Sequence, residues 1–242
     1  MVSAIKGETC RAYVRQRGVS DGTARRELGT LRAALRYCVT EGYLTHAPGV
    51  ALPDKPPSRE RWLTRSEAGA LLRAARAEPR ARFHLPLFIQ IGLYTGARKE
   101  AILALQWHPN TEGGWIDLTR GLIDFNATGR RQTKKRRPLI PIPPRLLRFL
   151  RYARRRTRQY VIEWHGAGVA DIKRSFGAAC KTAGLSGVSP HILRHTCATW
   201  LMQRGVSTLD AADFLGMSEE TIKRVYYHAH PQYMMAAVNA LR

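Results

Sequence analysis

Hydrophobic residues recur at helical spacing along most of the chain. Leu28, Leu31, Leu35 and Val39 follow one another at intervals of three and four residues, which places them on one face of a helix. The same pattern, with its polar breaks, predicts helices at Glu8–Arg17, Thr23–Glu41, Leu63–Ala77, Leu85–Tyr94, Glu100–Leu105, Arg145–Arg158, Val169–Ala183, Pro190–Arg204, Thr208–Leu215, Glu219–Tyr227 and Pro231–Leu241.

Three short apolar runs, separated by turn residues, interrupt the helical pattern. They are Gly113–Leu118, Gly121–Phe125 and Arg137–Ile142, and they predict a small antiparallel sheet. The turn before the third run is basic and contains Arg130, Arg131, Lys134, Lys135, Arg136 and Arg137. The expected fold class is therefore mainly α with a small antiparallel β-sheet.

A stretch rich in proline and charge, Pro53–Arg61, predicts an extended linker. We expect residues 53–62 to separate an N-terminal helical unit, residues 1–52, from a larger domain, residues 63–242. Two helices are few for an independent domain, so we expect either that residues 1–52 pack against another partner or that the chain begins partway through a longer helical domain. Thr64 and Glu67 form the T-x-x-E pattern of a capping box at the start of the larger domain.

Charge is the strongest compositional feature of the 242 residues. Forty Lys and Arg residues against 18 Asp and Glu give a formal net charge of +22, and the hydrophobic content of 44% is that of a folded chain. Such an imbalance indicates a polyanionic partner, most simply nucleic acid. A basic face with Arg25, Arg26, Arg32 and Arg36 marks the N-terminal unit. A second arginine stripe, on the helix predicted at Arg145–Arg158, either contacts such a partner or faces solvent.

The cysteines and the N-terminal sequence give no indication of a metal site, of secretion or of a membrane span. The four cysteines, at positions 10, 38, 180 and 197, form no CxxC pair, so no zinc site and no metal is expected. We find neither a signal-peptide pattern nor an apolar run of membrane-spanning length. The sequence predicts a soluble intracellular protein with no membrane association.

Residues suited to phosphodiester chemistry occur in separate segments of the larger domain. His191 and Arg194 lie three residues apart and share one helix face, although that spacing alone also fits a basic helix with a core histidine. Arg98 follows a helix break, and Tyr226 and Tyr227 lie near the C-terminus. Arginines neutralise charge on phosphate oxygens, and a tyrosine can attack phosphorus.

Three stretches carry a resemblance to the tyrosine recombinases, the phage-integrase family. They are TGARKEAILALQW (95–107), HILRHTCATWLMQRGV (191–206) and FLGMSEETIKRVYYHAH (214–230). The resemblance implies a tyrosine-recombinase-like catalytic domain, preceded here by a short, incomplete core-binding domain. It assigns catalytic roles to Arg98, Lys134, His191, Arg194 and Tyr226.

For the catalytic lysine and the nucleophilic tyrosine, the resemblance leaves two candidate residues each. Lys134 is preferred as the catalytic lysine and Lys135 is the second choice, while the other basic residues of that turn contact the DNA backbone or face solvent. Tyr226 is preferred to Tyr227 because it lies nine positions after Met217. His195 is expected to be structural, because it points about 100° away from Arg194.

Two positions depart from the family pattern. Met217 stands where the family has a histidine, and a thioether is a poor phosphate ligand. His228 or His230 could substitute for that histidine, or could be a solvated tail residue. Ala101 stands where an acid is usual; Glu100 is adjacent but rotated by about 100° on a helix. Glu100, Met217 and Lys135 are therefore supporting positions only.

The function that the resemblance implies is site-specific DNA recombination, as in the integration of prophages and other mobile elements, through a 3′-phosphotyrosyl intermediate and without cofactors. Double-stranded DNA is the expected partner. A homotetramer is implied, in which the helix at 231–241 docks on a neighbouring subunit or packs on its own domain. The expected location is the nucleoid in the cytoplasm of a prokaryote, with the gene of bacterial or phage origin. The rival hypothesis, based on Met217 and Ala101, is a DNA-binding architectural or regulatory protein with a weakened site.

Overall fold

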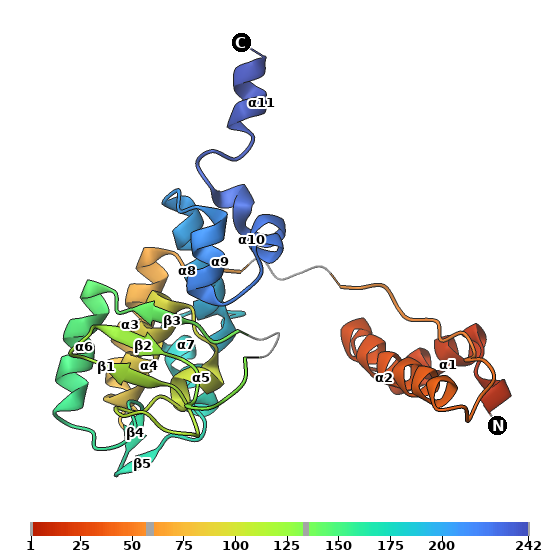
Figure 1. Cartoon of the computed structure of the whole chain (residues 1–242), viewed down its shortest axis with the longest axis horizontal. Helices are drawn as coiled ribbons and strands as arrows, with labels where there is room; N and C mark the ends of the chain where they lie inside the picture. Colours follow the sequence, from red (N-terminus) through yellow and green to blue (C-terminus); the bar gives the residue numbers. More distant parts are fainter. Residues whose placement is uncertain (1, 57–60, 133–135, 242) are drawn as a thin grey trace. The chain divides into compact units, whose positions relative to one another are not determined.

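A computed structural model of the protein describes residues 2–56, 61–132 and 136–241 (Figure 1). Lys134 and Lys135, the two candidates for the catalytic lysine, lie outside the described residues. The chain divides into two compact units, residues 1–60 and residues 61–242.

Unit 1 is a pair of helices preceded by a short 3₁₀ turn, η1 (Val2–Ala4). Its helices are α1 (Gly7–Arg17) and α2 (Asp21–Thr40). Their contact buries a small set of side chains: Cys10, Ala24, Leu28 and Leu35. Leu31 belongs to the same predicted stripe but is exposed, because a single partner helix covers only a narrow strip of α2. Glu27 of α2 accepts a hydrogen bond from Tyr13 and pairs with Arg17, which joins the two helices.

Unit 2 contains most of the helices. They are α3 (Arg65–Ala77), α4 (His84–Thr95), α5 (Lys99–Leu103), α6 (Pro144–Arg154), α7 (Lys173–Thr182), α8 (Pro190–Gln203), α9 (Thr208–Leu215), α10 (Glu219–Tyr226), the 3₁₀ turn η2 (Tyr227–Ala229) and α11 (Met235–Ala240). α4 is buried along nearly its whole length and packs against α8. Gly92 makes this close approach possible, because a Cβ there would lie 2.7 Å from Cδ1 of Leu193.

A three-stranded antiparallel sheet lies beside these helices, in the order β1 (Trp115–Asp117), β2 (Leu122–Asp124), β3 (Leu139–Pro141). Ile116, Ile123 and Ile140 are aligned across the three strands and are all buried. The apolar residue in the middle of each strand thus faces the core. A mainly helical fold with a small antiparallel sheet, as expected from the sequence, is confirmed.

Three predicted helices extend four residues beyond the observed ones at one end. The helix predicted to reach Arg158 ends at Arg154, because the backbone N–H groups of Arg158, Gln159 and Tyr160 bond to the carboxylate of Glu163 instead. The helix predicted from Val169 begins at Lys173. A two-stranded hairpin that the sequence did not predict, β4 (Glu163–Trp164) with β5 (Ala167–Gly168), precedes it, and Asp171 caps the backbone N–H of Ile172.

The last helix is also shorter than predicted. It covers Met235–Ala240 rather than 231–241, because Met234 has a left-handed backbone with φ of 57° that no α-helix continues. Apolar side chains at the end of the chain remain exposed: Met234, Met235, Val238 and Leu241.

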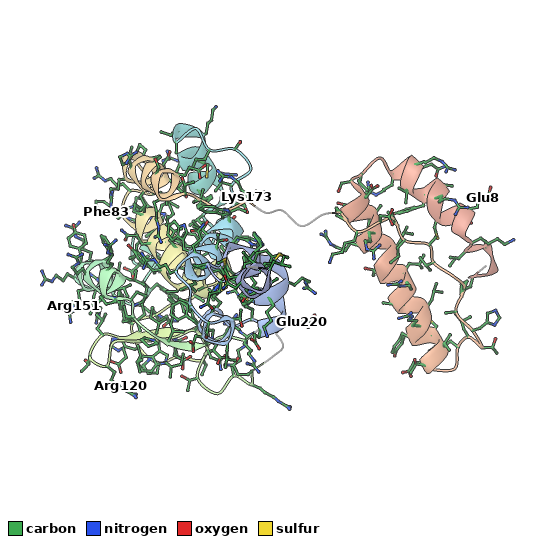
Figure 2. The ribbon with its side chains drawn as sticks, turned by 90° about the horizontal axis from the view of Figure 1, so that it is seen from above. Glu8, Phe83, Arg120, Arg151, Lys173 and Glu220 are labelled. Atoms are coloured by element: carbon green, nitrogen blue, oxygen red, sulfur yellow. The ribbon has the colours of Figure 1, made fainter. Side chains whose placement is uncertain are left out.

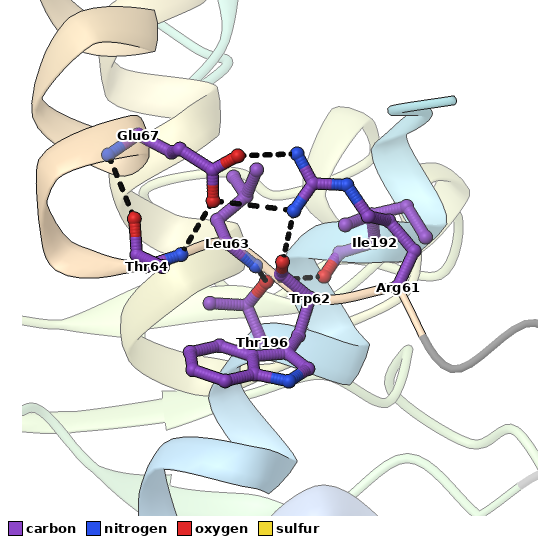
Figure 3. Close-up of polar contacts among 7 residues, drawn as sticks. All are labelled: Arg61, Trp62, Leu63, Thr64, Glu67, Ile192 and Thr196. Carbon is purple, nitrogen blue, oxygen red and sulfur yellow. Dashed lines mark hydrogen bonds and ion pairs between the residues drawn. The ribbon is translucent and has the colours of Figure 1, made fainter. Parts of the chain in front are cut away.

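The first residues of unit 2 are tied to α8 by a polar cluster (Figure 3). Thr64 and Glu67 form the predicted capping box, which is confirmed. Arg61 pairs with Glu67 at 2.6 Å, and its guanidinium lowers the pKa of that carboxyl to about 2. Leu63 N–H donates to Oγ1 of Thr196, which in turn donates to the carbonyl of Ile192. The chain that follows the linker is thereby anchored to the helix carrying His191 and Arg194.

Candidate phosphate-binding site

Arg194 is almost completely buried, although it is charged. Only 4% of its surface is exposed. Its Nη1 donates to the carbonyl oxygen of Gly96 at 2.7 Å, while its buried Nη2 has no partner among the described residues. Burial, followed by the nearby charge of Arg98, lowers the pKa of Arg194 to about 10. The guanidinium is therefore a fixed, poorly solvated cation with hydrogen-bonding capacity to spare.

The turn after α4 brings Arg98 to the same place. Gly96 caps α4 in the left-handed conformation, with φ of 63°, and Arg98 then starts α5 as its N-cap. Arg98 Nη1 donates to the carbonyl of Arg136 at 3.3 Å. A small pocket here is lined by several cationic and apolar side chains, including Arg98, Arg136, Arg137, Arg194, Phe125 and Leu215. The two predicted arginines are thus brought together.

Arg137 is a third cation at this pocket that points inward. Its Nη1 is buried and has no partner among the described residues. Burial lowers the pKa of Arg137, and the charges of Arg130 and Arg98 lower it further. The sequence placed Arg137 in a general group of DNA-backbone contacts. A partly buried guanidinium with one buried, unpaired nitrogen at the pocket with Arg98 is a more specific position than that. The spacing of hydrophobic residues did not predict the inward position of Arg137, since Arg136 and Arg137 look equivalent in the sequence.

Tyr226 is held on the inner face of α10. Ser218 caps this helix by accepting from Thr221 N–H, and Lys223 and Arg224 pair with acids one turn earlier. Ile222 and Tyr226, four residues apart, point into the same cluster of buried side chains, and Tyr226 is 6% exposed. Its neighbour Tyr227 packs instead against the rings of His230 and Tyr233. Of the two tyrosines, Tyr226 is the one whose hydroxyl bonds to a side chain of α8.

The contact that Tyr226 makes is with His195 and was not predicted. Its hydroxyl lies 2.7 Å from Nδ1 of His195, whose ring is also in edge contact with the ring of His191. The rotation of about 100° between His195 and Arg194, on which the expected structural role of His195 rests, does not keep His195 away from Tyr226. Positions 191 and 195 are four residues apart and differ by only about 40° around the helix. His195 therefore lies on the same side of α8 as His191, although it is rotated by about 100° from Arg194.

Glu100 and Met217, two of the three supporting positions, lie among the described residues. Glu100 is exposed and pairs with Lys99 at 3.6 Å, which in turn pairs with Asp171 at 3.1 Å. Met217 follows the left-handed Gly216, which packs against the backbone of Arg136 and the ring of Pro138. Met217 is partly buried against the cluster that contains Tyr226.

The remaining predicted basic residues lie on the surface, with one exception. Arg26, Arg32, Arg36, Arg130, Arg131 and Arg136 are exposed. Arg25 is only partly exposed and donates to the carbonyl of Pro53, so it helps to fold unit 1. The arginines of the predicted stripe at 145, 148, 151, 155 and 158 are exposed, and Arg151 lies at the outer surface of unit 2 (Figure 2). Of the tail histidines, His230 is buried and His228 is exposed.

The part of the chain that the structure describes contains neither a metal-binding cluster nor a membrane-spanning helix. No group of three or more His, Cys, Asp or Glu side chains there is arranged to hold a metal ion. No helix there combines the length and the apolar character needed to cross a membrane.

Comparisons with known proteins agree on one family. The model of the phage integrase family matches residues 61–233. The chain is 24% identical to the tyrosine recombinase XerC of Xanthomonas axonopodis pv. citri (strain 306), over 98% of this chain and 81% of that protein. It is 26% identical to the tyrosine recombinase XerD of Caulobacter vibrioides (strain ATCC 19089 / CIP 103742 / CB 15), over 94% and 78%. Its fold resembles that of the Tn1549 transposon integrase, solved in complex with circular intermediate DNA, with a TM-score of 0.74, 16% identity and coverage of 100% and 87%.

Proposed function

Because the chain belongs to the phage integrase family of tyrosine recombinases, we propose that it breaks and rejoins double-stranded DNA at specific sites. Tyr226 attacks the scissile phosphate, forms a 3′-phosphotyrosyl bond and releases a 5′-hydroxyl. The 5′-hydroxyl of a partner strand then attacks the phosphotyrosyl bond and restores the DNA backbone. The covalent intermediate conserves the energy of the broken linkage, so the reaction needs no ATP.

The observation that carries this proposal is the pair of buried guanidinium nitrogens that lack a partner in the described part of the chain, one on the buried Arg194 and one on the partly buried Arg137. Arg194 Nη2 and Arg137 Nη1 are buried without a partner among the described residues. No ion pair with a carboxylate is found there for Arg98, Arg137 or Arg194. A buried cation without a counter-charge is costly, and one that retains free donors is suited to an anion from outside the protein. A phosphodiester offers oxygens to all three guanidinium groups.

The roles of the other groups follow from the chemistry of that anion. Arg98 and Arg194 neutralise the charge that develops on the non-bridging oxygens, and His191, at the same edge of α8, adds a donor to the phosphate. The leaving 5′-oxygen takes its proton from Lys134, with Lys135 as the alternative. Arg137 extends the cationic pocket beyond the pair of arginines named by the family motifs.

DNA binding is proposed for the basic surfaces of both units. The net charge of +22 predicts that affinity falls steeply with salt, because each phosphate contact releases bound counterions. A plot of log K against log salt concentration that is flat would contradict this. The exposed apolar side chains of α11 are proposed to pack on a second copy in a tetramer assembled on two DNA sites.

Trapping on a nicked suicide substrate tests the proposal. The wild type should form a covalent protein–DNA adduct, Tyr226→Phe should form none, and Tyr227→Phe is the matched control that should keep the adduct. An adduct from Tyr226→Phe, or none from the wild type, would contradict the assignment. Relaxation of supercoiled plasmid without Mg²⁺, abolished by Arg194→Ala, is the second measurement. DNA binding without either activity would favour the architectural alternative.

A further inference from the structure

The hydrogen bond between Tyr226 and His195 is partly buried and joins two elements of unit 2. The phenol oxygen on α10 lies 2.7 Å from Nδ1 of the histidine on α8. Tyr226 is 6% exposed, and the two rings are tilted against each other with centroids 5.7 Å apart. Among the described residues this is the one hydrogen bond recorded for that hydroxyl.

We infer that His195 is a catalytic residue that accepts the phenolic proton of Tyr226 as the tyrosine attacks DNA, an inference that rests on the proposed recombinase function. The motif comparison named His191 for the histidine of this box. Among the described residues the His191 side chain makes no hydrogen bond to the tyrosine, and its ring lies edge-on to the ring of His195, at a centroid distance of 4.7 Å and an interplanar angle of 85°. The geometry therefore divides the two histidines, with His191 toward the phosphate side and His195 toward the nucleophile.

In the cleavage step, one bond to phosphorus forms as another breaks, and one proton moves to His195. The phenol oxygen forms the new bond to phosphorus with a lone pair, and its proton passes to Nδ1 of His195. The bond between phosphorus and the 5′-oxygen breaks, and that oxygen keeps the bonding pair and takes a proton from the general acid. In the rejoining step His195 returns its proton to the departing phenol oxygen, so the histidine ends in its starting state.

The charges around His195 favour its neutral form, which is the form that can accept a proton. Burial lowers the pKa of His195, and the neighbouring His191 and Arg194 lower it further. Burial also raises the pKa of Tyr226, although Arg194 opposes this. Full transfer before the attack is therefore unfavourable, and the proton moves as the bond to phosphorus forms. The titratable and charged groups around this pair are His191, Arg194 and Cys197 of α8, with Arg98 and Glu100 of the α5 start acting on His191.

Rates of adduct formation on the nicked substrate, measured as a function of pH, test the inference. His195→Asn places an amide oxygen near the position of Nδ1, which can accept a hydrogen bond but not a proton. We expect its rate at neutral pH to fall by about 100-fold or more, the range usual for loss of a general base, and to recover as pH rises toward the pKa of the tyrosine. The wild-type rate should decline below the pKa of His195, and this acidic limb should be absent in His195→Asn.

Controls separate proton acceptance from folding and from leaving-group chemistry. His108→Asn removes an exposed histidine and should leave the rate unchanged. His191→Asn should slow the reaction but keep the acidic limb. A substrate with sulfur in place of the bridging 5′-oxygen needs no protonation of its leaving group, so the defect of His195→Asn should persist on it. If His195→Asn does not fold, His195→Gln takes its place, with thermal unfolding as the check.

Other results of these experiments would contradict the role of His195, the recombinase proposal or both. A wild-type rate and pH profile in His195→Asn, a faster reaction than the wild type, or rescue by the sulfur substrate would overturn the role of His195 while leaving the recombinase proposal standing. Absence of any wild-type adduct would overturn both. Loss of the acidic limb in His191→Asn would move the role to His191.

Discussion

Arg194 of α8 donates from Nη1 to the carbonyl oxygen of Gly96 at 2.7 Å, so the arginine of one motif is held by the turn that carries the arginine of another. The bond spans 98 positions of sequence. It orients the buried guanidinium and leaves Nη2 free for a ligand. The turn at Gly96 is therefore part of the support of the site as well as the end of a helix.

Gly96→Ala should lower the free energy of unfolding of unit 2 through both a strained backbone and a steric clash. Gly96 has a φ of 63°, and a Cβ there would lie 2.3 Å from Cδ2 of Leu215. A left-handed alanine costs roughly 1–2 kcal/mol, and overpacking adds about 1–3 kcal/mol. Gly184→Ala is the matched control, because Gly184 has a φ of 67° with no atom within 4 Å of its added Cβ. Urea unfolding measures both variants, and equal losses would contradict the packing account.

Small anions should stabilise the free protein through its buried arginines. An anion that binds only the folded state raises its free energy of unfolding by mass action. Sulfate should raise the melting temperature of the wild type more than that of Arg194→Ala or Arg137→Ala, at equal ionic strength set with chloride. Arg151→Ala, on the exposed face of α6, is the control and should respond as the wild type does. A general salting effect would act alike on all four proteins.

Thr196→Val should loosen the anchor between the linker end and α8. Valine has the same shape but leaves Leu63 N–H without its acceptor, which lies 2.9 Å away in the wild type. A buried donor left without a partner costs about 1–3 kcal/mol. Hydrogen exchange should show faster exchange of the Leu63 amide together with lower stability. Thr199→Val is the control, since Thr199 makes no recorded side-chain hydrogen bond among the described residues; protection of Leu63 unchanged in Thr196→Val would refute the anchor.

Acid should destabilise the protein partly through His84. Burial lowers the pKa of His84 in the folded state, and its Nδ1 has no partner among the described residues. The unfolded chain therefore binds a proton first, near its reference pKa of about 6.5, so stability is present above that pH and is lost as pH falls through the folded pKa. His84→Phe should gain in unfolding free energy, relative to the wild type, between about pH 7.5 and about pH 5. His108→Phe, at an exposed position, should show no such gain.

Cleavage of substrates with different leaving atoms can show whether Lys134 or Lys135 is the general acid. Lys134→Ala should slow cleavage of ordinary DNA by about 100-fold or more, as expected for a general acid. The substrate with sulfur as the leaving atom should restore the rate of Lys134→Ala, while Lys135→Ala should show a small defect on both substrates. Rescue of Lys135→Ala alone would reverse the assignment.

The sequence by itself determined the secondary structure and the family of this protein. Spacing of apolar residues located most helices and the three strands, because burial on one face acts within a few residues of chain. Helix ends were less accurate at Arg154, Lys173 and Met235, where the carboxylates of Glu163 and Asp171 or a left-handed backbone stop the helix. Glu163 lies beyond the helix predicted at Arg145–Arg158, whereas Asp171 and Met234 lie within the other two predicted segments. A side-chain hydrogen bond or a left-handed backbone leaves the spacing of apolar residues unchanged, so periodicity did not register any of them.

Tertiary structure alone decided which side chains meet. Arg137 and Arg136 are equivalent in the sequence, yet only Arg137 has a buried guanidinium nitrogen at the pocket with Arg194. His195 looked structural from its rotation relative to Arg194, yet it holds the hydroxyl of Tyr226 across 31 positions. Such contacts depend on the packing of α10 and α8, and helical periodicity carries no information about what a neighbouring helix presents.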